Sequence, residues 1–223
     1  MSHSSFLPTL TRKYPKLTDV TIFPSSSELA TSDPHVGSVS TLVLGLVQVQ
    51  SIDISYLNES ALEHLGRLVT LESLTTVRFP TSLIARELSD IPMFSSLHTL
   101  IVGPGDIEST TGFMAMYSGS PLNSVDVQVV GAASTAALEK FYSALATGCS
   151  HASLTFFLFK GFGFHIPQTE RAAYVHPLSP LYRFANLTSV DIQSSHRFDV
   201  DDSTIINMAR AWPRIESLRL SAR

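Results

Sequence analysis

One short apolar pattern recurs along the chain and constrains its fold more than any other feature. The pattern is an apolar residue, any two residues, an apolar residue, any one residue and a third apolar residue (L-x-x-L-x-L). Successive copies begin on average about 28 residues apart, which lies within the roughly 20–29 residues of leucine-rich repeats. Such recurrence predicts a stack of similar units. The copies, of which the one at His151 is degenerate, begin at Leu17, Val49, Leu74, Leu97, Leu122, His151, Leu187 and Ile215.

Each copy predicts a short strand, because its fourth and sixth positions point to the same side of an extended chain. Segments with helical periodicity fill several of the intervals. Asn58, Ser134 and either Asp201 or Asp202 can cap three of these helices. Ser179-Pro180 is a further helix start, and shorter helices are predicted over Leu83–Leu88 and Phe113–Tyr117.

A strand, a crossover helix and a parallel strand form a right-handed unit. Stacking such units predicts an α/β leucine-rich-repeat solenoid, with a curved parallel sheet on the concave side and helices on the convex side. The alternative is a doubly wound α/β domain, which also alternates strands and helices but needs no fixed repeat motif. We expect one array of about seven or eight irregular repeats over residues 1–223.

Two segments depart from the regular spacing. Val39–Leu44 also matches the pattern but lies too close to Val49 for two repeats, so one of these two stretches is interpreted as an extra strand or a hairpin arm. The interval after the His151 copy is the longest and contains many aromatic residues. Residues 157–180 are therefore predicted to form a long loop insertion.

Composition and charge exclude several classes of partner. Charged residues make up 15 % of the chain, the net charge is −4, and hydroxyl residues supply most of the polarity. A nucleic-acid surface of clustered Lys and Arg is therefore not expected. The single cysteine, Cys149, precludes an intramolecular disulfide and suits a reducing compartment. With neither a signal peptide nor an apolar run long enough for a bilayer, we expect no membrane partner and a cytoplasmic or nuclear location.

Known catalytic motifs are missing from the sequence. It contains no G-x-S-x-G, G-x-x-x-x-G-K-[ST], H-E-x-x-H or C-x-x-C motif, so we expect no catalytic residues and no cofactor. Cys149 is interpreted as a small core residue. Neither the histidines nor the acidic group before the last helix has the spacing of metal ligands, so no metal is expected. These residues are His151, His165, His176, Asp199, Asp201 and Asp202.

The repeats resemble those of F-box/leucine-rich-repeat proteins. Asp202–Pro213 followed by Ile215–Leu220 is similar to their usual capped helix, bulky residue, proline and L-x-x-L-x-L. Tyr56–Leu65 with Leu71–Leu74 resembles the irregular repeats of the large fungal F-box group. In that family an N-terminal F-box docks on the linker subunit of a cullin–RING ubiquitin ligase, and the repeats hold the substrate. Here the first residues already read as a repeat, so the resemblance covers the repeat region without the F-box.

If the fourth and sixth positions face the core, the third and fifth face outward from the strands. The third positions are almost all Ser or Thr, which suits hydrogen bonding to a protein or peptide on the concave face. The alternative is that these hydroxyls are merely tolerated on a solvated sheet. Aromatic residues of the long interval are either further anchors or core filling. The tentative partner-binding residues are Asp53, Arg78, Asp126, Asp191, Arg219, Phe162 and Phe164.

The function expected from these features is a non-catalytic protein–protein interaction module. The resemblance implies the substrate-recognition repeats of an F-box subunit, with cullin–RING ligase subunits as further partners if an F-box is present elsewhere. The alternatives are a structural scaffold with no ubiquitin role and an enzyme with an unrecognised site.

Overall fold

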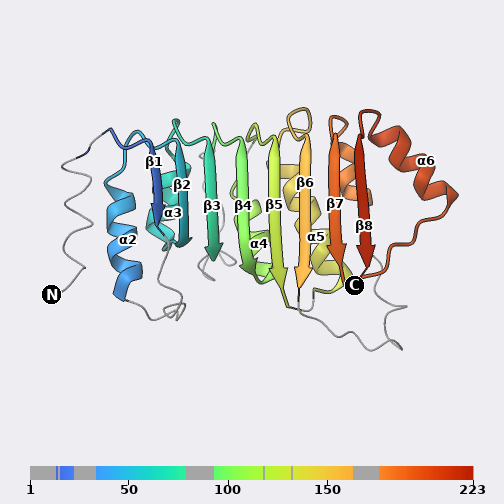
Figure 1. Cartoon of the computed structure of the whole chain (residues 1–223), viewed down its shortest axis with the longest axis horizontal. Helices are drawn as coiled ribbons and strands as arrows, with labels where there is room; N and C mark the ends of the chain where they lie inside the picture. Colours follow the sequence, from blue (N-terminus) through green and yellow to red (C-terminus); the bar gives the residue numbers. More distant parts are fainter. Residues whose placement is uncertain are drawn as a thin grey trace.

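The chain folds into one sheet of eight parallel strands that alternate with helices (Figure 1). The computed structural model describes residues 14, 16–22, 34–78, 93–117, 119–131, 133–162 and 176–222. The strands lie side by side in sequence order, so the sheet is open, with β1 and β8 at its edges. They are β1 (Asp19–Ile22), β2 (Ser51–Tyr56), β3 (Ser73–Arg78), β4 (Thr99–Gly105), β5 (Ser124–Val130), β6 (Phe156–Phe162), β7 (Ser189–Ser194) and β8 (Ser217–Ala222).

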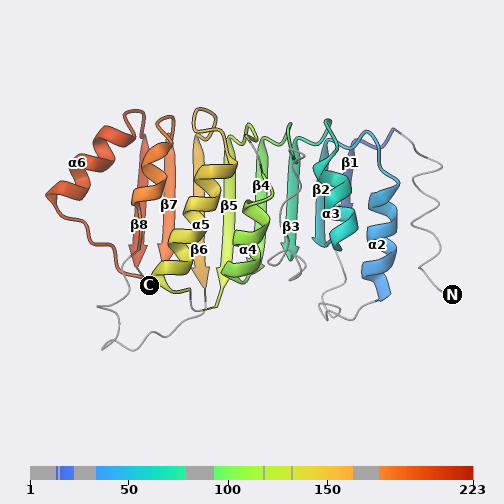
Figure 2. The same cartoon turned by 180° about the vertical axis from the view of Figure 1, so that it is seen from behind.

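The helices α3, α4 and α5 lie behind the sheet in Figure 1 and in front of it in Figure 2, so they cover one face only. The predicted caps at Asn58, Ser134 and Asp201 are confirmed, since each side chain accepts a hydrogen bond from a backbone N–H in the first turn. The helices are α2 (Pro34–Leu44), α3 (Glu59–Gly66), α4 (Ile107–Met114), α5 (Thr135–Gly148), the 3₁₀ helix η4 (Ser179–Arg183) and α6 (Asp202–Ala211).

The fourth position of each repeat forms a continuous apolar ladder between the sheet and the helices. In the six inner strands these side chains are no more than 1 % exposed, and each burial stabilises the fold by about 1.5–3 kcal/mol. The strand register aligns them from one repeat to the next, so every unit packs against its neighbours. The ladder consists of Ile52, Leu74, Leu100, Val125, Phe157 and Val190.

Two copies of the repeat are shifted by three residues from their predicted frames. In β3 the fourth position is Leu74, which pairs with Ile52 and Leu100, so this copy begins at Leu71. In β6 the fourth position is Phe157, which pairs with Val125, so this copy begins at Leu154. The frames predicted from Leu74 and His151 are therefore wrong.

Two irregular segments are also corrected. Of the two closely spaced stretches, one of which was predicted to be an extra strand or hairpin arm, Val39–Leu44 belongs to the helix α2, which begins at Pro34, and the stretch from Val49 leads into β2. Residues 157–162 of the predicted loop insertion lie in β6, and its last two residues, Ser179 and Pro180, begin η4. Residues 163–175 of that insertion and the helix predicted over Leu83–Leu88 lie outside the described residues.

The last repeat is less covered than the inner ones. Leu218 of β8 occupies the same repeat position as Val190 of β7, yet it is 44 % exposed whereas Val190 is fully buried. The helix α6 is fixed to the array through Trp212, which is buried and donates a hydrogen bond to the Leu181 carbonyl at 3.1 Å. The ring of Tyr182 packs edge-on against Trp212.

Candidate functional site

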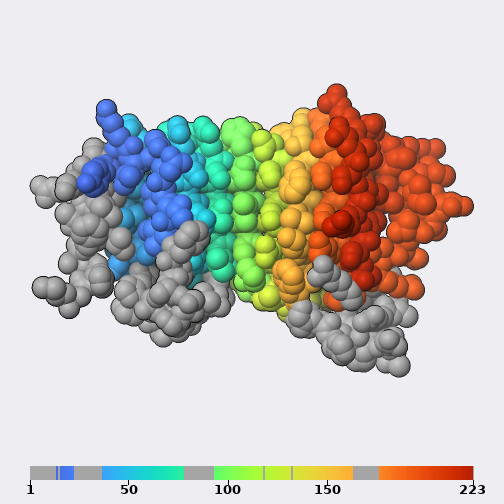
Figure 3. Space-filling model, in the orientation of Figure 1, coloured from blue at the N-terminus to red at the C-terminus, as the bar shows by residue number. Residues whose placement is uncertain are grey.

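No described helix covers the second face of the sheet, here called the open face. In the space-filling view the strands appear as adjacent bands of side chains from β1 to β8 (Figure 3). Two rows of side chains cross it, each taking one residue from every strand. The first row contains Asp19, Ser51, Ser73, Thr99, Ser124, Phe156, Ser189 and Ser217. The second row contains Thr21, Asp53, Thr75, Ile101, Asp126, Leu158, Asp191 and Arg219.

The strand β6 interrupts this mostly hydrophilic surface with an apolar ridge. Phe156 is 36 % exposed, and Leu158, two residues further along the same face, is half-buried. At the end of β6, Phe162 lies opposite Val130 of β5, and both side chains are exposed. A contiguous group of bulky apolar side chains on a solvated sheet face is a recognised mark of a contact surface.

Asp126 of β5 lies between two apolar neighbours in the second row, Ile101 of β4 and Leu158 of β6. Its side chain is half-buried, and its Oδ1 is shielded from solvent and accepts no hydrogen bond among the described residues. Burial raises the pKa of the Asp126 carboxyl above its usual range, and the attraction of the Lys160 ammonium partly opposes that rise.

Asp191 of β7 lies on the other side of Leu158, but its carboxylate has partners. Arg219 of β8 approaches Asp191 Oδ2 to 3.7 Å, and the side-chain amide of Gln193 donates to both carboxylate oxygens at 3.3 and 3.4 Å. Because the Arg219 side chain is 70 % exposed, this ion pair contributes little to stability. Asp126 and Asp191 therefore flank the same ridge but differ in their partners, since of the two only the Asp191 carboxylate accepts hydrogen bonds among the described residues.

The other predicted site residues are dispersed. Asp53 lies in the second row on β2, three strands from Asp126, and burial raises the pKa of its carboxyl. Arg78 is in register with Tyr56 at the end of β3, outside the second row to which it was assigned. Phe162 ends β6 and is partly exposed, as predicted, and Phe164 lies outside the described residues.

Sequence reasoning missed Phe156 and Leu158. The frame chosen for the sixth copy placed Phe156 in the core, whereas the register places Phe157 and Phe159 there instead. The run Phe156–Phe159 fits either frame, because all four residues are apolar. The neighbouring strands decide it, by aligning Phe157 with Val125 and Val190.

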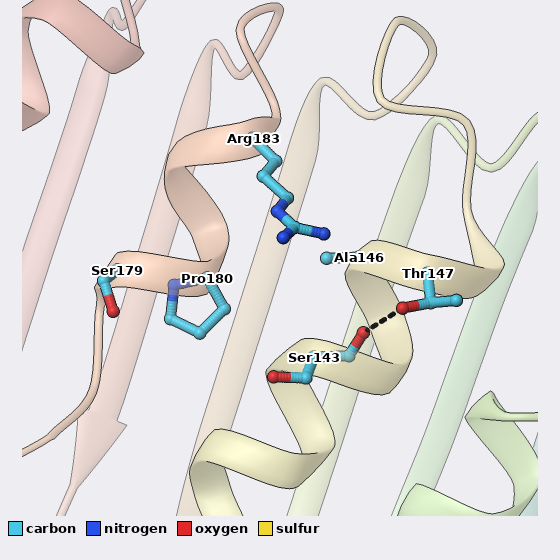
Figure 4. Close-up of a pocket in the computed structure, with 6 residues that line it drawn as sticks. All are labelled: Ser143, Ala146, Thr147, Ser179, Pro180 and Arg183. Carbon is cyan, nitrogen blue, oxygen red and sulfur yellow. Dashed lines mark hydrogen bonds between the residues drawn. The ribbon is translucent and has the colours of Figure 1, made fainter.

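A cavity of about 350 Å³ opens on the other side of the molecule, between α5 and η4. Figure 4 shows the Arg183 side chain extending from η4 toward Ala146 and Thr147 of α5. The Thr147 hydroxyl donates to the Ser143 carbonyl at 2.9 Å, so it is already partnered within the helix. The lining residues combine one guanidinium with hydroxyl groups and include no carboxylate, imidazole or thiol that could act as a general base.

A buried polar cluster lies between α5 and β7. The Tyr142 hydroxyl and His176 Nε2 are 2.5 Å apart, and the ring of His196 packs edge-on against His176. Burial, reinforced by His196, lowers the pKa of His176 to about 3, so the imidazole is neutral at physiological pH. Both histidines are almost fully enclosed, which places this cluster in the core and away from substrate.

The described parts of the chain contain no group of three or more His, Cys, Asp or Glu side chains arranged to hold a metal ion. Cys149 is buried, and burial raises the pKa of its thiol to about 12. None of the helices in these parts combines the length and apolar character that crossing a membrane requires.

Comparison with known proteins leaves the chain without an assigned family. No protein-family model matches it, and no curated protein is significantly similar to it.

Proposed function

We propose that this chain is a leucine-rich-repeat interaction module that binds another protein on the open face. The observation that carries the proposal is the open face itself, which spans eight strands, is covered by none of the described helices and bears an apolar ridge on β6. A sheet face that served only to complete the fold would need no such ridge, because the core already lies on the opposite face.

Two observations together support the assignment to leucine-rich repeats: the recurring sequence pattern, and the position of its copies on parallel strands. The strands carry L-x-x-L-x-L copies, run parallel in sequence order, and keep their fourth positions in register. A doubly wound domain changes strand order at a switch point, where its ligand site forms, and this sheet has no such change. The solenoid, with the open face as its concave side, is therefore the favoured architecture.

The partner class follows from the surface and from the sequence resemblance. Serine and threonine dominate the first row, with no cluster of cations for phosphate. This composition suits a protein or peptide bound by hydrogen bonds and apolar contacts. By resemblance, the module is the substrate-recognition part of an F-box subunit, and cullin–RING ligase subunits are further partners if an F-box is present elsewhere.

The proposal is tested by site-specific photo-crosslinking in cells, followed by mass spectrometry. A photoreactive residue replaces Ser124 on the open face or, as a control, Ser143 on α5. We expect discrete protein adducts from position 124 and few from position 143. Adducts from position 143 alone would contradict binding on the open face. Adducts from position 124 without co-purified ligase subunits would exclude the ubiquitin role and leave the interaction module standing.

A further inference from the structure

The position of Asp126 within the apolar part of the open face points to a particular kind of partner. We propose that the region formed by β4, β5 and β6 binds a protein segment that carries a cationic side chain flanked by apolar side chains, with Asp126 as the anchor of the cation. This inference rests on the proposed function and names the class of partner that the open face receives.

The apolar side chains of the two rows are concentrated around Asp126. Ile101 and Leu158 are its direct cross-strand neighbours, and Phe156 belongs to the first row on the strand of Leu158. Every other residue of the two rows is Ser, Thr, Asp or Arg. Adjacent strands are about 4.8 Å apart, so Ile101 and Leu158 are separated by about 10 Å. Three or four residues of an extended segment cover that distance.

Asp126 is the carboxylate of this region that lacks a donor. Its Oδ1 is shielded and accepts no hydrogen bond among the described residues, whereas Asp191 accepts from Gln193 and faces Arg219. Lys160 attracts the Asp126 carboxylate electrostatically but leaves Oδ1 without a hydrogen bond. A donor brought by the partner would satisfy a carboxylate that is already partly desolvated, and a charged donor does so most strongly.

The charge of the open face favours a cation over an anion. Among its described strand residues, four aspartates oppose two cationic side chains, Lys160 and Arg219. The aspartates are Asp19, Asp53, Asp126 and Asp191. The excess of acidic groups attracts a basic segment, and the apolar neighbours of Asp126 determine where it binds.

The test uses three short fluorescent peptides of defined sequence and measures their binding by fluorescence anisotropy at about 0.15 M ionic strength. The first has a Leu-Ser-Arg-Ser-Phe centre, in which the alternation of an extended chain directs the leucine, arginine and phenylalanine side chains to one side. The second replaces the arginine with glutamate, and the third replaces the leucine and phenylalanine with serine. We expect the first peptide alone to bind the wild-type protein.

Matched variants then locate the site. Asp126→Asn is expected to weaken binding of the first peptide at least about tenfold, because it removes a charged acceptor. Asp53→Asn removes the same charge from the same row on β2 and is expected to leave binding unchanged. Leu158→Ser is expected to weaken binding, whereas Val69→Ser, which alters an exposed side chain in the turn before β3, is not. Circular dichroism checks that every variant is folded.

Several outcomes would overturn the inference. Equal losses from Asp126→Asn and Asp53→Asn would mean non-specific attraction of a cation. Equal binding of the glutamate peptide, or no binding of any peptide, would contradict the assigned chemistry. A dimer in sedimentation that Leu158→Ser abolishes would identify a second copy as the occupant. In each case, protein adducts from position 124 would leave the proposed function intact, and their absence would remove that function as well.

Discussion

The buried imidazole of His176 makes the stability of the C-terminal repeats depend on pH in a calculable way. His176 is 3 % exposed, and the rings of Phe198, Tyr142 and Phe159 lie 5.0, 5.4 and 5.7 Å from its own ring. Its Nδ1 has no hydrogen-bond partner in the described structure. Protonation would therefore place an uncompensated positive charge among aromatic side chains, which is costly.

The magnitude follows from the difference in pKa between the folded and unfolded states. Burial, and to a lesser extent His196, lowers the pKa of His176 from 6.5 to about 3. A base with a lowered folded pKa contributes full stability above its unfolded pKa and loses it as the pH falls toward the folded pKa. Each pH unit below the unfolded pKa of 6.5 lowers the free energy of unfolding by about 1.4 kcal/mol. Lowering the pH from above 6.5 to about 5 therefore lowers the free energy of unfolding by about 2 kcal/mol. His196, whose pKa is also lowered by burial, acts in the same direction.

The assay is urea unfolding at about pH 7 and about pH 5, followed by circular dichroism. Between the two pH values, the free energy of unfolding of the wild type is expected to fall by about 2 kcal/mol more than that of His176→Gln, because glutamine does not titrate. His98→Gln, which alters an exposed histidine before β4, should retain the wild-type dependence. Equal losses in the wild type and in His176→Gln would refute the reasoning, whatever the absolute stability of the variant.

Three further predictions concern the ladder, its facing and a cap. Leu100→Ala should lower the free energy of unfolding by about 2–5 kcal/mol and Leu218→Ala by less than about 1 kcal/mol, although both residues occupy the fourth repeat position. Equal losses of free energy in urea unfolding would contradict the difference in burial. Leu100→Asp should unfold the array and Asp126→Ala should leave it folded, so comparable losses of melting temperature would contradict the assigned faces. Ser134→Ala should cost about 1 kcal/mol because the Ser134 hydroxyl accepts from the Ala137 N–H, and an unchanged melting temperature would exclude the cap.

The strands could be located from the sequence, but two of their frames could not. Leu71, Leu74 and Val77 are three residues apart, so the first and fourth positions of the pattern are filled by apolar residues in both frames, and the sixth position favours the frame from Leu74. The frame in the structure places Thr76 at an inward position, where it is fully buried, and an apolar template does not anticipate a hydroxyl there. Pairing with the neighbouring strands selects this frame, and pairing is a non-local property that one copy of a repeat does not contain.

Because a single repeat copy does not fix its own frame, the residues of the open face could be predicted only in part. The predicted roles of Asp126 and Asp191 as outward residues are confirmed, because both copies were assigned the correct frame. Leu158, which separates the two carboxylates, was hidden in a run of apolar residues with no internal alternation. In α2, the match of Val39–Leu44 to the strand pattern was misleading, because helical spacing brings Val39, Leu42 and Val43 to one face equally well.

The buried indole of Trp212 gives the molecule an intrinsic optical reporter. It is the chain's single tryptophan, and it lies at the junction of α6 with η4, held by the bond to the Leu181 carbonyl. Its emission therefore reports on the junction between α6 and η4, whereas the far-ultraviolet ellipticity averages over all the units. Any separation between the two unfolding midpoints would measure how strongly the terminal unit is coupled to the remainder, without the introduction of a label.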